Sequence, residues 1–196
     1  MYRFLETIRF EDGAFQLPEL HQARLEQTFA TFFPNHNPLK LLKCLPHLDL
    51  HGTYKFRFVY DQTGFQISYE PYKVKRIESI SIVHSALDYP FKFSDRAAFA
   101  HLLQSVPSDE IIIVKNGRIT DASYANLAFY DGNTWYTPRE PLLHGVMRTH
   151  LLRKGLIQLR DIYPDDLHTF QKVSLINAML NLGHVTFPTA QITSRP

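Results

Sequence analysis

The chain contains very little cysteine: Cys44 is the single cysteine among 196 residues. One cysteine excludes a disulfide within the chain and a cysteine-based metal site, and it is typical of proteins from a reducing compartment. The ten histidines do not show the paired spacing of metal ligands. We therefore expect a cytoplasmic protein that holds no metal.

Long apolar runs and an excess of one charge are also missing. No stretch of about 18 apolar residues could span a membrane, and residues 1–13 carry charges where a secretory signal would be apolar. Lysine and arginine number 21 against 19 acidic residues, which gives a net charge of +2 without clustering. This balance argues against a nucleic acid or an acidic membrane as the partner.

What the chain does contain is enough apolar material for a core, since 44% of its residues are hydrophobic and 13% are aromatic. That amount suffices for one domain or for two small lobes. There is no repeat, low-complexity tract or Gly/Ser-rich linker. Because the stretch 86–93 is irregular, we expect an α+β lobe over residues 1–88 and a β-rich lobe over residues 89–196.

Turn residues and hydrophobic periodicity predict the elements of the first lobe. A hairpin over residues 4–15 is expected to turn at Asp12-Gly13, and an apolar helical face begins near Pro18. A short amphipathic piece follows, and then a second hairpin over residues 53–72. A strand at residues 77–85 completes this part.

The remaining sequence predicts mostly strands. Ser94 is a plausible N-cap for a helix that runs to about residue 106. The pattern then indicates three strands, a helix and a last strand-like segment; they lie at residues 110–117, 125–131, 134–138, 145–155 and 172–180.

Three features could carry chemistry, and each has an ordinary alternative. The helix that begins at Gly145 offers free N–H groups and a positive dipole end, which suit a phosphate, although most helix N-termini bind only water or a capping side chain. Lys92 lies between two phenylalanines. Its amine either reaches solvent from a strand edge or is held in an apolar pocket, where desolvation would make it a nucleophile. Asp121 could equally be a solvated turn residue or a cap.

Seven segments resemble, in order, those of the fold-type IV pyridoxal-phosphate enzymes: FLETIRFEDG, HQARLEQT, FKFSDR, GRITDASYANLAF, YTP, GVMRTHLL and SLINAMLNLGHV. This group is the aminotransferase class IV family of branched-chain and D-amino acid aminotransferases and aminodeoxychorismate lyases. The resemblance covers most of the chain, and residues 117–148 are its most specific part. It implies the two-lobed α+β fold of D-amino acid aminotransferase with a shortened N-terminal lobe, the cofactor in the cleft between lobes, and an isologous homodimer.

The resemblance also implies a binding site for pyridoxal 5'-phosphate. Lys92 would attach the cofactor and move the substrate proton, while Asp121 would keep the ring nitrogen protonated as an electron sink. Arg24 would donate to the phosphate with its planar fork. The other cofactor-binding residues that the resemblance implies are Ser123, Asn126, Val146, Met147, Asn177 and Ala178. Ser123 could instead serve in a turn or cap, and Asn126 could hold the loop that shapes the pocket.

Three details within the family favour the lyase branch over the aminotransferases. FKFSDR resembles the lyases, in which an arginine follows the lysine by four residues, and it lacks the tyrosine of amino-transferring members. GVMR has methionine where many transaminases carry threonine, and INAML places an asparagine at the phosphate position. The expected activity is therefore release of pyruvate from 4-amino-4-deoxychorismate to give 4-aminobenzoate, a folate precursor. The alternatives are an aminotransferase acting on a small D- or branched-chain amino acid, and a non-catalytic protein that kept the fold.

The sequence departs from the family pattern at three places. Asp121 replaces the usual glutamate and is one methylene shorter, so its contact with the ring either needs a closer backbone or runs through water. Glu6 stands where a lyase can have threonine as a proton donor, and its role stays open. The stretch before Phe4 is short compared with typical members, which leaves the substrate less certain than the cofactor.

Overall fold

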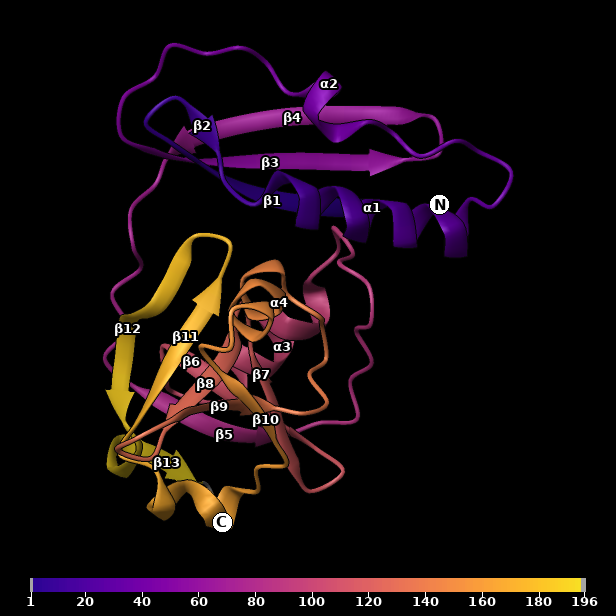
Figure 1. Cartoon of the computed structure of the whole chain (residues 1–196). Helices are drawn as coiled ribbons and strands as arrows, with labels where there is room; N and C mark the ends of the chain where they lie inside the picture. The colour runs from indigo at the N-terminus through magenta and orange to yellow at the C-terminus, as the bar shows by residue number, and fades with distance from the viewer. Residues whose placement is uncertain (1, 195–196) are drawn as a thin grey trace. The chain divides into compact units, whose positions relative to one another are not determined.

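The computed structural model describes residues 2–194, and the chain divides into two compact units. The first unit holds the chain up to Val74 together with Phe91–Asp95. The second holds Lys75–Pro90 and the chain from Arg96 onward. Figure 1 labels the helices and strands of both units.

A four-stranded antiparallel sheet of order β2-β1-β3-β4 forms the first unit. Its strands are β1 (Phe4–Glu11), β2 (Ala14–Phe15), β3 (Thr53–Asp61) and β4 (Gly64–Pro71). Both expected hairpins are confirmed. The first turns at Asp12 and Gly13, whose φ angles of 46° and 86° are those of the primed turns that match strand twist.

Alternation along β1 builds the core of this unit. Phe4, Ile8 and Phe10 face one side, and they meet the buried aromatic residues of β3 through the strand register. The helix α1 (Pro18–Phe32) begins at the expected proline and contributes Leu25 and Phe29 to the same core. The short helix α2 (Leu41–Cys44) packs beside α1.

The boundary differs from the one expected between residues 88 and 89, because the first unit ends at Val74 and the strand expected at residues 77–85 belongs to the second unit. The chain then returns to the first unit for the five residues Phe91–Asp95. Phe93 forms an antiparallel bridge with Phe4, and the N–H of Ser94 donates to the carbonyl of Arg3 at 2.8 Å. Lys92 therefore belongs to the first unit, not to the C-terminal lobe. Such pairing between residues far apart in sequence leaves no local pattern, which is why the sequence did not reveal it.

The second unit contains a nine-stranded sheet of order β10-β9-β8-β7-β6-β5-β13, with β11 paired to β8 and β12. Its strands are β5 (Ile80–His84), β6 (Glu110–Lys115), β7 (Arg118–Ala122), β8 (Asn126–Tyr130), β9 (Trp135–Pro138), β10 (Gln158–Arg160), β11 (Lys172–Asn177), β12 (Leu180–Pro188) and β13 (Ile192–Ser194). The helices are α3 (Ala97–Gln104) and α4 (Val146–Arg153), with 3₁₀ turns at Pro164–Thr169 and Thr189–Gln191. The helix α3 packs on β6, and α4 packs on β11.

Two sequence expectations for the second unit need correction. Arg96, not Ser94, is the N-cap of α3, and it makes no side-chain cap hydrogen bond. The strand-like segment at 172–180 comprises the whole of β11, a turn and the first residue of β12, because Asn177 begins a tight connection between the two strands. The separate strand β7 was also missed.

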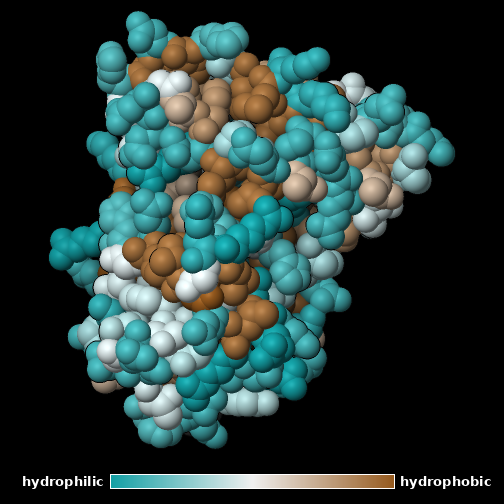
Figure 2. Space-filling model, viewed as in Figure 1, coloured by the Kyte–Doolittle hydropathy of each residue, from teal (hydrophilic) through white to brown (hydrophobic). Residues whose placement is uncertain are grey.

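Apolar side chains reach the surface of the first unit, where Figure 2 shows brown atoms among hydrophilic ones. Phe65 and Tyr69 on the edge strand β4 are exposed, yet they stack on the buried rings of Phe58 and Phe56 at 4.9 and 4.7 Å between centroids. They are therefore the outer layer of the core. No helix within the described residues is long and apolar enough to cross a membrane.

Candidate functional site

Lys92 is anchored on β1 through its backbone. The N–H of Leu5 donates to the Lys92 carbonyl at 2.9 Å, and the N–H of Phe93 donates to the carbonyl of Phe91 at 3.0 Å, which places Lys92 at the centre of a three-residue turn. Phe91 and Phe93 both pack against the ring of Phe32. The lysine side chain is half-buried. Its two neighbours thus fix the segment in the aromatic core, and Lys92 itself is neither fully buried nor fully exposed.

A buried carboxylate lies on the strand next to this lysine. Glu6 of β1 is 0% exposed and points toward α1. Arg24 donates from Nε to Oε1 of Glu6 at 2.8 Å and from a terminal nitrogen to Oε2. His21, three residues earlier on α1, lies 2.6 Å from Oε2 through its Nδ1. The spacing of three residues puts both side chains on the helix face that meets β1.

The three groups set one another's protonation. Burial by itself would raise the pKa of Glu6, but the charge of Arg24 and the hydrogen bonds from His21 and Arg24 lower it from 4.5 to about 2. Burial lowers the pKa of His21, and the hydrogen bond to Glu6 only partly opposes this. A charged Glu6 and a neutral His21 require Nδ1 to carry the proton. The Nε2 atom of His21 is then a buried acceptor that meets no hydrogen-bond partner among the described residues.

In the second unit, Asp121 lies at the end of β7 and is 5% exposed. Asn126 donates from Nδ2 to Oδ1 of Asp121 at 2.7 Å, and the backbone N–H of Leu143 donates to Oδ2 at 2.9 Å. Asn126 also donates to the Leu143 carbonyl at 2.8 Å. The acid and the amide therefore hold the loop that leads into α4, and both carboxylate oxygens already accept protein hydrogen bonds.

The protonation of Asp121 is balanced near neutrality. Burial raises its pKa from 3.8 to about 6, although the hydrogen bonds from Asn126 and Leu143 and the charge of Arg148 lower it. Arg148 of α4 is itself buried and donates to the carbonyls of Pro138 and Arg139 at 2.8 and 3.3 Å. Burial lowers the pKa of Arg148, and the charge of Asp121 opposes this. The arginine is thus the buried counter-charge of the acid.

The start of α4 has the properties of an anion site. Gly145 is the N-cap residue and supplies no side chain, and no other side chain in the described part of the chain caps this helix. The amides of Val146 and Met147 belong to the first turn, where N–H groups have no partner within the helix. A Cβ at Gly145 would stand 2.0 Å from Oδ1 of Asn126, so the close approach of this turn to Asn126 requires glycine.

Three further predicted residues are engaged through the backbone or in turns. The N–H of Ser123 donates to Oε1 of buried Glu110 at 2.9 Å, and its carbonyl accepts from Arg96. The side chain of Asn177 accepts the N–H groups of Met179 and Leu180 at 2.8 and 3.0 Å. Ala178 lies within that turn. The Asn177 side chain therefore shapes the turn, and its Nδ2 donates to the carbonyl of Tyr124 at 3.3 Å.

The sequence missed the polar residues that support these groups. The sequence gives Glu6 no defined role, and His21 is one of ten histidines without the spacing of metal ligands. Glu110 and Arg148 each lie inside a run that is typical of an ordinary strand or helix. A charged residue within an apolar pattern is the one signal that could have identified them.

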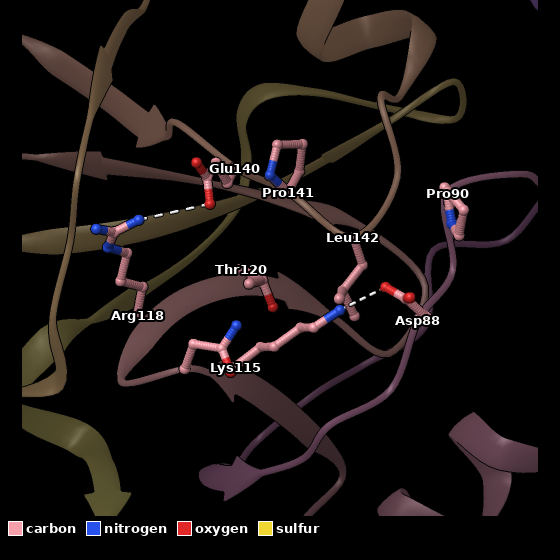
Figure 3. A pocket seen from close by; sticks show the side chains of 9 residues that line it. Asp88, Pro90, Lys115, Arg118, Thr120, Glu140, Pro141 and Leu142 are labelled. Carbon is pink, nitrogen blue, oxygen red and sulfur yellow. Dashed lines mark hydrogen bonds and ion pairs between the residues drawn. The ribbon is translucent and has the colours of Figure 1, made fainter.

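A separate pocket of about 250 Å³ lies in the second unit, but it does not include the predicted site residues. Figure 3 shows that ion pairs border it, Lys115 with Asp88 and Arg118 with Glu140. Thr120 lines it, whereas Asp121, the next residue on the strand, points to the other side. Within the described residues, no group of three His, Cys, Asp or Glu side chains could hold a metal ion.

Comparisons with known proteins agree on one family. The family model described as amino-transferase class IV matches residues 93–186. An uncharacterised protein from Haemophilus influenzae is 34% identical over 189 residues, which cover 93% of this chain and 100% of that protein.

Solved structures give the same result. The crystal structure of a putative 4-amino-4-deoxychorismate lyase from Haemophilus somnus is 33% identical, with a TM-score of 0.87 over 93% of this chain and 98% of that one. The PLP-bound form of a hypothetical aminotransferase from Mycobacterium tuberculosis shares the fold at 16% identity, with a TM-score of 0.72 over 97% of this chain and 81% of that one.

Proposed function

Because the chain belongs to the amino-transferase class IV family, we propose that it is a pyridoxal 5'-phosphate-dependent lyase that releases pyruvate from 4-amino-4-deoxychorismate and leaves 4-aminobenzoate. The observation that carries the choice of reaction is the likeness to the Haemophilus somnus protein, at 33% identity over 93% of the chain. The FKFSDR and GVMR segments favour the same branch of the family.

The donor set of the chain fits this cofactor. It offers a primary amine on a fixed backbone, a guanidinium, a helix start without a side-chain cap and a buried carboxylate. These are the groups that an aldehyde, a phosphate and a pyridine nitrogen require. When bound, pyridoxal phosphate supplies an electron sink for the bond changes at the substrate.

We propose that Lys92 holds the cofactor through its amine. Once the substrate amine has displaced it, the Nζ atom of Lys92 removes the substrate proton and later returns it. Arg24 donates to the phosphate, as do the amides of Val146 and Met147. Both oxygens of Asp121 accept hydrogen bonds from the protein. Asp121 would therefore act on the ring nitrogen either through the electric field of its buried negative charge or by accepting a further hydrogen bond with a remaining lone pair.

A second candidate is amino transfer, which the name of the matching family supports. A lyase needs no amino acceptor, whereas a transaminase consumes a 2-oxo acid. Purified protein loaded with cofactor is incubated with 4-amino-4-deoxychorismate, and pyruvate is measured with and without an added 2-oxo acid. Pyruvate release that is independent of the acceptor, and that is lost in Lys92→Ala, supports the lyase. Transfer of the amino group that requires the 2-oxo acid would contradict the lyase proposal and support a transaminase.

We also propose that the protein is an isologous homodimer. Light scattering of the purified protein should give twice the chain mass of 22.8 kDa. A monomer mass for active protein would contradict this part of the proposal.

A further inference from the structure

We propose that Glu6 is a positioning residue that orients the Arg24 guanidinium toward the cofactor phosphate. This inference rests on the proposed function and deepens it, because it gives a role to a residue that the family resemblance left open. Glu6 does not contact the cofactor in this account; it acts through Arg24.

The geometry of the pair supplies the first argument. Nε and one terminal nitrogen of Arg24 meet the two oxygens of Glu6, which is the two-point, fork-to-fork arrangement. Two contacts fix the plane of the guanidinium as well as its distance. A single contact, or a lysine in place of Arg24, would leave that plane undefined. The Arg24 side chain is 11% exposed, so it is not completely sealed inside the protein as Glu6 is.

The charge balance supplies the second argument. The negative charge of Glu6 lies directly against the positive charge of Arg24, so the arginine serves as a directional donor more than as a bare cation. Burying such a pair is costly, because the desolvation of two ions offsets much of their attraction. His21 adds to the cost, since its Nε2 is buried without a partner in the described part of the chain. Apolar side chains would fill this space at a lower free-energy cost of folding, which indicates that the three polar residues have a functional role in addition to packing.

The position on β1 supplies the third argument. Leu5 holds the Lys92 backbone through its N–H, and the next residue, Glu6, holds Arg24 through its side chain. Consecutive residues of one strand thus fix the backbone that carries the amine and the plane of the guanidinium. Within the first unit, β1 therefore holds both the Lys92 backbone and the Arg24 guanidinium in place.

The test compares two ligands that differ only in the phosphate. Apo protein is titrated with pyridoxal 5'-phosphate and with pyridoxal, and binding is followed by absorbance. Glu6→Gln keeps the size of the side chain but removes its charge and one acceptor oxygen. We expect it to weaken pyridoxal 5'-phosphate binding by about tenfold or more, from the loss of a charge-assisted contact, and to leave pyridoxal binding unchanged.

Two further variants distinguish a specific effect of Glu6 from a general loss of folded structure. Thr28→Val removes another buried polar group of α1, one turn beyond Arg24, and should keep the full preference for the phosphorylated ligand. Glu6→Asp keeps the charge but is too short for the same two contacts, and should lose part of the preference. Thermal unfolding of each variant shows whether it is folded.

The outcomes separate this inference from the proposed function. Wild-type protein that binds neither ligand overturns both. Wild type that prefers pyridoxal 5'-phosphate, with the same preference in folded Glu6→Gln and Glu6→Asp, overturns only the role of Glu6. An equal loss of affinity for pyridoxal 5'-phosphate and for pyridoxal would also contradict the role of Glu6, because it indicates a general structural change in the first unit. Selective loss of the phosphate preference supports it.

Discussion

The contact between Gly145 and Asn126 gives the sharpest stability prediction. Gly145 has φ −69° and ψ 147°, an extended conformation that alanine adopts without strain. The cost of Gly145→Ala therefore comes only from the clash, in which the new Cβ would stand 2.0 Å from Oδ1 of Asn126. The Asn126 side chain has to move, and it then loses its hydrogen bonds to Asp121 and to the Leu143 carbonyl.

The size of the effect follows from those two bonds. One involves a carboxylate and the other a neutral carbonyl, so their loss amounts to about 2 to 4 kcal/mol of unfolding free energy. The chain has one tryptophan, Trp135, and it lies on β9 of the second unit. Its fluorescence during urea unfolding therefore reports on the affected unit, and the midpoint should fall by roughly 1 to 2 M.

A double-mutant cycle tests the mechanism behind this number. If the displaced side chain is the whole cost, Gly145→Ala in the background of Asn126→Ala should change stability by less than about 0.5 kcal/mol. Gly64→Ala changes a glycine of the first unit with open space around it, and it should leave the Trp135 transition of the second unit unchanged. Additive effects of the two changes, or a neutral Gly145→Ala, would refute the reasoning.

Three further predictions concern buried charges. The pKa of Asp121 is raised from 3.8 to about 6, so the folded state binds its proton more tightly, and the contribution of Asp121 to the stability of the second unit should fall by about 3 kcal/mol as pH rises from 4 to 6. Urea unfolding followed by Trp135 fluorescence in wild type and in Asp121→Asn would isolate this contribution. The pKa of Glu6 is lowered from 4.5 to about 2, so its contribution is present above pH 4.5 and is lost as pH falls toward 2; near-ultraviolet circular dichroism should show a shallower acid limb in Glu6→Gln. Arg148→Met removes the counter-charge of Asp121 and the donor to Pro138, and we expect a loss of about 3 kcal/mol or more in urea unfolding. An unchanged midpoint for Arg148→Met, or a pH profile of opposite slope, would contradict these assignments.

The sequence predicted the local elements well where a local signal existed. The Asp12-Gly13 hairpin and the helix beginning at Pro18 follow from turn chemistry and periodicity, and both are confirmed. The segment around Lys92 was not foreseen as part of the first unit, because its pairing with β1 joins residues almost ninety positions apart.

The site residues likewise divide into those with a local sequence signal and those that depend on contacts between distant parts of the chain. Lys92 and Asp121 could be singled out because their motifs resemble those of a family. The partners of Asp121 could not, since a carboxylate one methylene shorter than usual can meet Asn126 and Leu143 only if the loop before α4 folds back onto it. Glu6 lies on the same face of β1 as Phe4 and Ile8, and nothing in that pattern shows that two polar groups of α1 will meet it.

The most direct test of the central claim is to map where the cofactor attaches. Protein incubated with pyridoxal 5'-phosphate is reduced with borohydride, digested and analysed by mass spectrometry. The account predicts one modified lysine, Lys92, at close to one equivalent per chain, and no label at this peptide in Lys92→Ala. Label spread over surface lysines, or an unmodified Lys92 in protein saturated with cofactor, would contradict it.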